Sequence, residues 1–270
     1  MTHDPIIVRA SSLTSYADCQ RMWAARTMPA LVEAAGFTLR TVPHNIGAKV
    51  GTAVHSGAAH MLKEKIRTGE TGSRQAAVDA GIESLRDEVQ EGANWDETTP
   101  TMNTAERQTE RMVSIYHMLV APQIKPIAVE LEMTARFSPT LKITGHLDVG
   151  EEDQIDDTKT GVMQRPNHPQ YGAYSLLRRS AGHKVSRFFE DYIPRTSIKT
   201  AQREPTRTEY PVASCEQSAR AILKSIDQAV GAFVADGNAW SFIPNPASML
   251  CADRFCPAFN SDFCRVHKVK

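Results

Sequence analysis

The amino-acid sequence predicts an α/β fold. Helical patterns fill most of the first half of the chain, three short strands follow, and then come a further helix and strand. The helical segments repeat apolar residues every three or four positions, whereas the strands are β-branched and bounded by Pro, Gly and acidic residues. The predicted order of the elements is helix, three strands, helix, strand. With 270 residues, 41% of them hydrophobic and 23% charged, the chain has ordinary globular composition and enough length for a sizeable core.

The clearest helical pattern covers residues 46–67, where apolar residues recur at helical spacing. Small residues in it, such as Gly51 and Gly57, would let another element approach closely. In 11–26, serines could cap a short amphipathic helix. The other helices are expected at about 73–91, 102–121, 168–182 and 214–236.

The strands are expected at 125–133, 141–149 and 154–160, and then at 185–193 and, more weakly marked, at 207–212. The last thirty or so residues are rich in Pro, Asn, Cys and aromatic residues and show no clear period.

The charge balance excludes a strongly basic protein. Lysine plus arginine equals aspartate plus glutamate, at 31 each, so any nucleic-acid binding must be local. No apolar run approaches the roughly 20 residues that span a bilayer, and the first residues do not resemble a secretory signal. We therefore expect a soluble protein without a membrane partner, in the cytoplasm of a bacterial or phage-infected cell.

Two carboxylates and a lysine stand out in neighbouring strands. Asp148 ends one strand and Asp157 lies early in the next, so a tight turn between them would bring the carboxylates together. Side chains alternate along a strand, which puts Asp157 and Lys159 on one face. Carboxylates can hold Mg²⁺ and a lysine can steady developing charge, as phosphodiester hydrolysis requires. Taken alone, the Asp-x-Lys spacing also fits an ordinary ion pair on a surface hairpin.

Several motifs occur in an order that resembles the RecB-like exonuclease branch of the PD-(D/E)XK nuclease superfamily. Family members show G-x-x-x-H, G-x-x-D, D-x-K-T-G and Q-x-x-x-Y. The matching segments here are Gly51-Thr52-Ala53-Val54-His55, Gly145-His146-Leu147-Asp148, Asp157-Thr158-Lys159-Thr160-Gly161 and Gln170-Tyr171-Gly172-Ala173-Tyr174.

The resemblance implies an αβββαβ core with a mixed central sheet, and it implies roles for six residues. His55, Asp148 and Asp157 would bind Mg²⁺ or Mn²⁺, and Asp148, Asp157 and Lys159 would be catalytic. Gln170 and Tyr174 would support the site or contact nucleic acid; as an i, i+4 pair they could equally hydrogen-bond to each other. Glu130 and Glu132 lie on the strand that precedes Asp148, where a third acid could bind metal or face solvent; of the two, Glu130 is included as a candidate.

Four of the five cysteines resemble the iron–sulfur subset of these nucleases, including AddB-type and CRISPR-associated exonucleases. That resemblance joins one early cysteine to three late ones, here Cys19, Cys251, Cys256 and Cys264, as ligands of a 4Fe–4S cluster. The spacings between the late cysteines are C-x4-C and C-x7-C, looser than the C-x2-C and C-x5-C of those families. Zinc would also accept four thiolates, and buried cysteines without a metal are a third interpretation. Cys215 is expected to be an apolar filler.

A basic stretch at 178–207 holds eight Lys and Arg against three acids, so it could track phosphates or form an ordinary solvated face.

Together these features predict one nuclease domain over 1–270, with its core at about 40–212 and an iron–sulfur subregion from 11–26 plus 240–270. The resemblance implies metal-dependent hydrolysis of DNA at ends or on single strands, in recombination, repair or phage DNA processing, and a helicase or recombination protein could be a partner. Alternatives are a non-catalytic DNA-binding or assembly protein and a restriction-type endonuclease.

Overall fold

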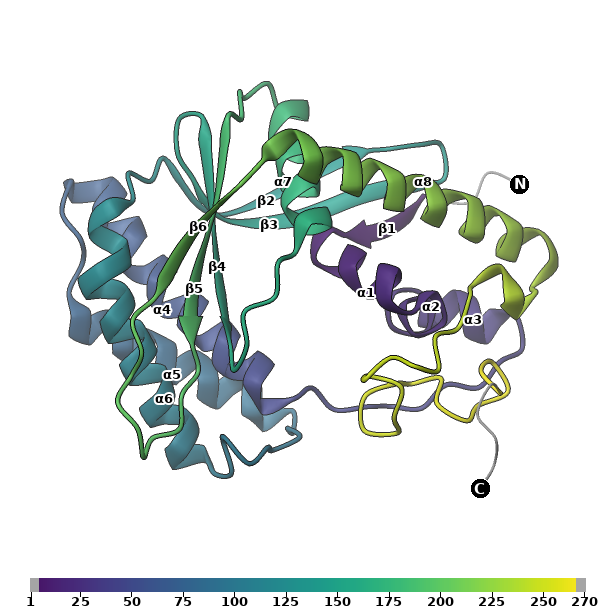
Figure 1. Ribbon diagram of the computed structural model, residues 1–270, viewed down its shortest axis with the longest axis horizontal. Helices are drawn as coiled ribbons and strands as arrows, with labels where there is room; N and C mark the ends of the chain where they lie inside the picture. Colours follow the sequence, from purple (N-terminus) through teal and green to yellow (C-terminus); the bar gives the residue numbers. More distant parts are fainter. Residues whose placement is uncertain (1–4, 266–270) are drawn as a thin grey trace.

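The computed structural model describes residues 5–265, and in these residues the chain forms a six-stranded mixed sheet with helices on both faces (Figure 1). The last five residues of the expected iron–sulfur subregion, 266–270, lie outside this range. The strands are β1 (Ile6–Arg9), β2 (Ala128–Arg136), β3 (Leu141–Gly150), β4 (Gln154–Gly161), β5 (Arg187–Pro194) and β6 (Thr206–Tyr210).

Strand β3 is the centre of the sheet. It pairs parallel with β1 and antiparallel with β2 and β4, and β4 then pairs parallel with β5, which pairs antiparallel with β6. The three consecutive strands and the two later ones lie where the sequence predicts them. Strand β1 was not predicted, because four residues are too few to show a period.

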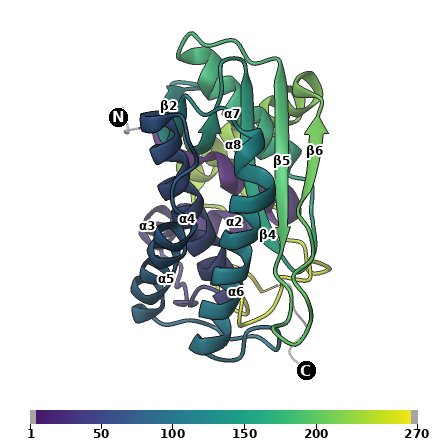
Figure 2. The ribbon, with the colours of Figure 1, turned by 90° about the vertical axis from the view of Figure 1, so that its left-hand side faces the viewer.

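Three helices cover one face of the sheet: α4 (Ile46–Thr68), α5 (Arg74–Gln90) and α6 (Met102–Ile115). Their apolar side chains form one hydrophobic core, to which the sheet contributes Val149 and Ile193. The segment predicted as one helix over 102–121 leaves α-helical geometry after Ile115, in a π-helical turn η2 (Tyr116–Val120) and a 3-10 turn η3 (Ala121–Gln123). Figure 2 shows these helices in front of the sheet.

Helices α7 (His168–Ser180) and α8 (Val212–Asp236) lie on the other face. They form a second hydrophobic core together with the N-terminal helices and residues 256–264. In this core, the ring of Tyr171 stacks on that of Phe188 in β5, with the ring centroids 4.5 Å apart. Within the described range, no helix is both long enough and apolar enough to cross a membrane.

The helix expected at 11–26 is interrupted. After the 3-10 turn η1 (Ala10–Ser12), α1 (Leu13–Asp18) and α2 (Gln20–Thr27) are separated by Cys19, whose backbone is extended. The C-terminal segment, residues 242–265, stabilises this break. Asn245 Nδ2 donates to Asp18 O at 2.9 Å, and Ser248 Oγ donates to Asp18 Oδ2 at 2.6 Å. Local periodicity could not reveal an interruption that contacts 230 residues along the chain stabilise.

Helix α3 (Pro29–Ala34) and the 3-10 turn η4 (Ala239–Ser241) complete this end of the molecule. In Figure 1 the C-terminal segment runs beside α2 and α3, and an extended link from residue 37 to residue 45 leads from there to α4.

Candidate active site

Two glycines allow helices to approach the strands that carry the carboxylates. A Cβ on Gly51 would lie 2.8 Å from Thr160 Oγ1, so α4 meets β4 where Gly51 stands, and His55 follows one turn later. A Cβ on Gly145 would lie 2.8 Å from the ring of Tyr174, so the first motif glycine of β3 makes room for α7. The glycines of two motifs thus set the distance between helix and sheet.

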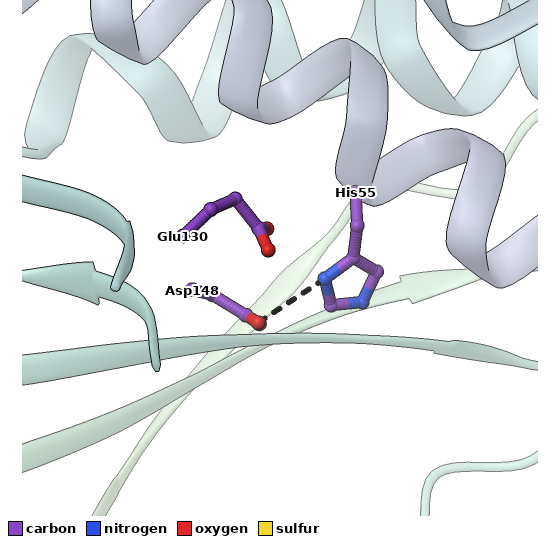
Figure 3. A group of neighbouring side chains, drawn as sticks. All are labelled: His55, Glu130 and Asp148. Carbon is purple, nitrogen blue, oxygen red and sulfur yellow. Dashed lines mark ion pairs between the residues drawn. The ribbon is translucent and has the colours of Figure 1, made fainter. Parts of the chain in front are cut away.

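Three side chains meet between α4, β2 and β3. His55 Nδ1 lies 3.3 Å from Asp148 Oδ1, and Glu130 points into the same space (Figure 3). One ligand atom from each of these three residues lies within 4.8 Å of the others. Among residues 5–265 this is the only group of three or more His, Cys, Asp or Glu side chains so arranged.

Glu130 reaches this group through an irregularity in β2. The antiparallel register pairs Val129 with Val149 and Leu131 with Leu147, but the pair between them, Glu130 and Asp148, is missing. Glu130 has a φ of 52°, in the left-handed region that residues other than glycine rarely adopt. Such backbone strain is frequent at functional sites.

Asp157 and Lys159 lie next to this group. Lys159 Nζ contacts Asp157 Oδ2 at 2.7 Å, and the Asp157 side chain is only 1% exposed. The backbone amide of Thr158 donates to Asp148 Oδ2 at 2.8 Å, which links β4 to the His55–Asp148 pair. The alternation predicted for β4 is confirmed, since Asp156 points to the opposite side and pairs with Arg207.

The charges of the site are strongly coupled. Burial raises the pKa of Asp157 to about 7, although the nearby Lys159 ammonium opposes this effect. Burial alone would lower the pKa of His55, but the negative charge of Asp148 and its hydrogen bond outweigh burial and raise that pKa to about 9. Burial also raises the pKa of Glu130, and repulsion from Asp148 adds to the shift. Burial would raise the pKa of Asp148 as well, but the charge and hydrogen bond of His55 hold it below its ordinary value. Asp157 and Glu130 therefore stay ionised only at a cost that a cation would relieve.

The site opens into a cavity of about 1010 Å³. His55, Glu130, Asp148 and Lys159 line it, together with Gln170 and Tyr174 of α7. Gln170 Nε2 donates to the Tyr174 hydroxyl at 2.8 Å, so these two residues form a hydrogen-bonded pair that also faces the cavity.

The donor set fits a divalent cation. An imidazole nitrogen and two carboxylates are ligands that Mn²⁺ accepts, and carboxylate oxygens suit Mg²⁺. When bound to such a site, a divalent ion lowers the pKa of water and neutralises charge on a phosphoryl oxygen. The chain itself contributes the Lys159 ammonium, held by Asp157 at the edge of the cavity, and the Thr158 amide, which orients Asp148.

Comparison with known proteins identifies the family. The profile of the PD-(D/E)XK nuclease superfamily matches residues 9–265. The chain belongs to the PD-(D/E)XK nuclease superfamily. A crystal structure from Eubacterium rectale, named "Putative exonuclease", has the same fold, with a TM-score of 0.61 over 91% of this chain and 87% of that one, at 10% sequence identity. A search among curated proteins finds no match.

The expected nuclease fold, with its mixed central sheet and flanking helices, is thus confirmed. The six residues expected at the nuclease site lie in one region: His55 contacts Asp148, Asp157 contacts Lys159, and Gln170 contacts Tyr174. Asp157 is not a member of the three-ligand group, whereas Glu130 is. Glu130 is the third acid included as a candidate from the sequence, and Glu132 is exposed.

The basic stretch at 178–207 does not form a free phosphate-binding surface, so that interpretation was wrong for most of its residues. Arg178 is buried and donates to Glu151 O at 2.6 Å. Four other arginines pair with carboxylates: Arg179 with Glu216, Arg187 with Glu209, Arg195 with Asp96, and Arg207 with Asp156 and Asp191. The guanidiniums of Arg178, Arg195 and Arg207 are largely buried, whereas Arg179 and Arg187 form ion pairs at the surface.

Four of the cysteines share a place far from the nuclease site. Cys19, Cys251, Cys256 and Cys264 line one small cavity between α2 and the C-terminal segment. No three sulfurs in the described residues lie within 4.8 Å of one another. Cys215 is buried in α8, away from this cavity, as expected for an apolar filler.

Proposed function

We propose that this PD-(D/E)XK nuclease hydrolyses DNA phosphodiester bonds with Mg²⁺ or Mn²⁺, as an exonuclease that acts on ends or single strands. The roles follow the sequence prediction, with one addition. His55, Asp148 and Glu130 bind the metal, Asp157 completes its carboxylate environment, and Lys159 stabilises developing charge. Gln170 and Tyr174 support the cavity wall. The pathways we propose are recombination, repair or phage DNA processing, in which a helicase or recombination protein would supply the substrate.

One observation carries this proposal: the Lys159–Asp157 ion pair lies beside the only described group of three metal-binding side chains, at the wall of one large cavity. A surface hairpin, the ordinary alternative for an Asp-x-Lys sequence, would leave Asp157 exposed. The side chain is instead 1% exposed, and its charge is tolerated only with a cationic neighbour. Burial of this kind is typical of groups with a chemical role.

The test is a cleavage assay on end-labelled single- and double-stranded DNA with Mg²⁺, Mn²⁺ or EDTA. We expect metal-dependent degradation, and loss of at least about 10²-fold in kcat for Asp157→Ala and for Lys159→Ala with the fold retained. Glu132→Ala is the matched control, because Glu132 is an exposed acid two residues from Glu130. Full activity in either site variant would contradict the assignment.

The same assay distinguishes the rival functions. Cutting of closed circular DNA at defined positions would indicate a restriction-type endonuclease. DNA binding without cleavage under any metal would indicate a binding or assembly protein that keeps the nuclease fold. Nothing in the site favours this second rival, because both carboxylates and the lysine of the motif are present.

We also propose that the four-cysteine cavity holds a 4Fe–4S cluster, as in the RecB-like branch that the motifs resemble. Two observations support a thiolate-bound group. Arg21 is 3% exposed, and burial lowers the pKa of its guanidinium; negative charge on Cys264 and Cys19, which lie nearby, would oppose this effect. Its Nη2 atom is buried without a hydrogen-bond partner. The guanidinium lies over the rings of Trp240 and Phe263 and donates to two backbone carbonyls, but it forms no ion pair with a carboxylate of the described residues. Thiolates would supply the opposite charge.

Zinc is the alternative ligand for the same thiols. A tetrahedral zinc ion with Zn–S bonds of about 2.3 Å holds its four sulfurs about 3.8 Å from one another. In the described residues, no three of these cysteine sulfurs lie within 4.8 Å of one another. That spacing favours the larger cluster. The visible spectrum and the iron and zinc content of anaerobically purified protein decide between them: a brown protein with iron and sulfide supports the cluster, and a colourless protein with one zinc per chain contradicts it.

A further inference from the structure

The cavity of the nuclease site continues into two others. Asn45, at the start of α4, lines all three. The second cavity, of about 600 Å³, and the third, of about 780 Å³, also share Arg254 and Phe255 of the C-terminal segment. We call these two cavities the distal groove. Its walls are α2, the link 37–45, the loop 94–100 and the C-terminal segment, so it leads from the site toward the N-terminal helices.

Three arginines from three separate segments face the distal groove: Arg26 of α2, Arg40 of the link, and Arg254. All three are exposed. Arg26 Nη2 donates to Phe255 O, and Arg40 Nη2 donates to Asp253 O at 3.4 Å. Unlike the four paired arginines of 178–207, none of them forms an ion pair with a carboxylate of the described residues. Their charges are available to a ligand.

The acids around the distal groove do not cancel this charge. Glu33 is the one acid among the described residues that line the second cavity. In the third cavity, Asp96 is already paired with Arg195 at 2.8 Å, which leaves Glu97. Three unpaired guanidiniums therefore face two unpaired acids in the groove, a small local positive excess in a chain whose net charge is zero.

Two aromatic rings line the same groove. Trp95 is 41% exposed in the third cavity, and Phe255 lies below the Arg254 guanidinium, 4.6 Å from ring centroid to Cζ. Unpaired bases stack on such rings and on guanidinium planes, each stack contributing about 1–3 kcal/mol. Bases inside a duplex are already stacked on each other and cannot use these surfaces. Arginines with interleaved aromatics therefore fit single-stranded nucleic acid.

We propose that the distal groove binds the single-stranded DNA adjoining the phosphate that is cleaved. Arg26, Arg40 and Arg254 contact its phosphates, and Trp95 and Phe255 stack with its bases. This proposal rests on the proposed nuclease function for the identity of the ligand, but the groove can be tested by binding alone. The continuity through Asn45 means that a strand engaged at Lys159 extends into the groove without leaving the protein surface.

The test compares a triple variant, Arg26→Gln/Arg40→Gln/Arg254→Gln, with a control of equal charge change, Arg74→Gln/Arg107→Gln/Arg220→Gln. The control arginines are exposed and line none of the three cavities. Binding of a labelled single-stranded oligonucleotide of about 20 nucleotides is measured in EDTA by fluorescence anisotropy at several salt concentrations, and a trinucleotide too short to fill the groove is measured in parallel.

Each phosphate contact to a single strand contributes about −0.7 to the slope of log K against log salt. We expect the triple variant to lose about 2 from this slope and to bind the long oligonucleotide at least about tenfold more weakly, with the trinucleotide unaffected. The control should match the wild type. Equal slopes in the triple variant and the control, or a wild type that binds no single strand, would overturn the proposal.

Two further variants keep the result interpretable. Arg26 and Arg40 donate hydrogen bonds to the C-terminal segment, so their loss could loosen it. Arg254 donates no side-chain hydrogen bond within the described structure. We therefore expect Arg254→Gln alone to reduce the slope by about 0.7 without lowering Tm. Arg254→Lys should restore the slope. If the wild type binds single strands through the groove but cleaves no DNA, the nuclease function is refuted and the groove proposal stands. If the wild type cleaves DNA but the arginine substitutions leave its binding unchanged, the groove proposal is refuted and the nuclease function stands.

Discussion

Glu130 lies opposite Asp148 across the β2–β3 ladder, at the one position where the register omits a pair, and it does so with a φ of 52°. Each feature is unfavourable alone, since a left-handed non-glycine residue costs about 1–2 kcal/mol and two partly buried carboxylates repel each other. Both are explained if the position exists to place two oxygen ligands around one cation.

This relationship predicts an unusual response to substitution at position 130. In a strand, glycine is normally less stable than alanine by about 0.5–1 kcal/mol, but at a left-handed φ the order reverses. We expect Glu130→Gly to be more stable than Glu130→Ala by about 1 kcal/mol in chemical denaturation, and both to bind Mn²⁺ more weakly than the wild type. A glycine variant less stable than the alanine variant would show that Glu130 is not strained.

Metal binding should stabilise the protein measurably. At a metal concentration about 100 times Kd, a ligand that binds only the folded state adds about 2.7 kcal/mol, which corresponds to roughly 5–10 °C in Tm for a chain of this size. We expect this shift with Mn²⁺, its reversal by EDTA, and its loss in Asp148→Asn. Glu132→Gln should keep the full shift, and an equal shift in Asp148→Asn would place the metal elsewhere.

Arg207 should be a major stabilising residue whose effect depends on pH. It pairs with two buried carboxylates, Asp156 and Asp191. Burial raises their pKa values to about 7 and about 6, against about 3.9 in the unfolded chain, so their ionisation opposes folding as the pH rises between those values. Arg207→Met leaves both without a cation, and we expect a loss of about 3 kcal/mol at pH 8 that shrinks toward pH 5. Urea denaturation at several pH values measures it, and a loss that grows at low pH would contradict this reasoning.

Arg21 should control how much metal the four cysteines retain. Its guanidinium is buried beside Cys19 and Cys264 and would balance the charge of thiolates. Burial raises the pKa of Cys256 to about 11, so its thiol needs a metal or a cation to ionise near neutral pH. We expect Arg21→Met, purified anaerobically, to carry at least severalfold less iron and sulfide per chain, with Arg74→Met, at an exposed arginine of α5, as the control. Undiminished iron content would remove Arg21 from the proposal.

Much of the fold could be predicted from sequence because the signals are local. The five later strands and five of the helical patterns lie close to their predicted positions. Apolar residues recur every two positions in a strand and every three to four in a helix, so a short stretch of sequence is enough to show either pattern. One error arose where distant residues decide the structure. The break at Cys19 depends on Asn245 and Ser248. A second error has a local origin: α6 ends at Ile115, and the chain continues as a π-helical turn and then as a 3-10 turn that contains Pro122.

The sequence by itself determined that Asp157 and Lys159 share a face, that His55 lies on a helix and Asp148 on a strand, and that glycines stand where helix and sheet must meet. These features depend on backbone periodicity and on the absence of a side chain. Only the tertiary structure decided that Glu130, and not Glu132, joins His55 and Asp148. It also decided that four arginines of 178–207 pair with carboxylates, whereas Arg26, Arg40 and Arg254 form no such pair in the described residues. The physical reason is that burial makes an unpaired charge costly, so a buried charged side chain pairs with an opposite charge that folding brings near it. The residues next to it in the sequence do not reveal which residue that partner is.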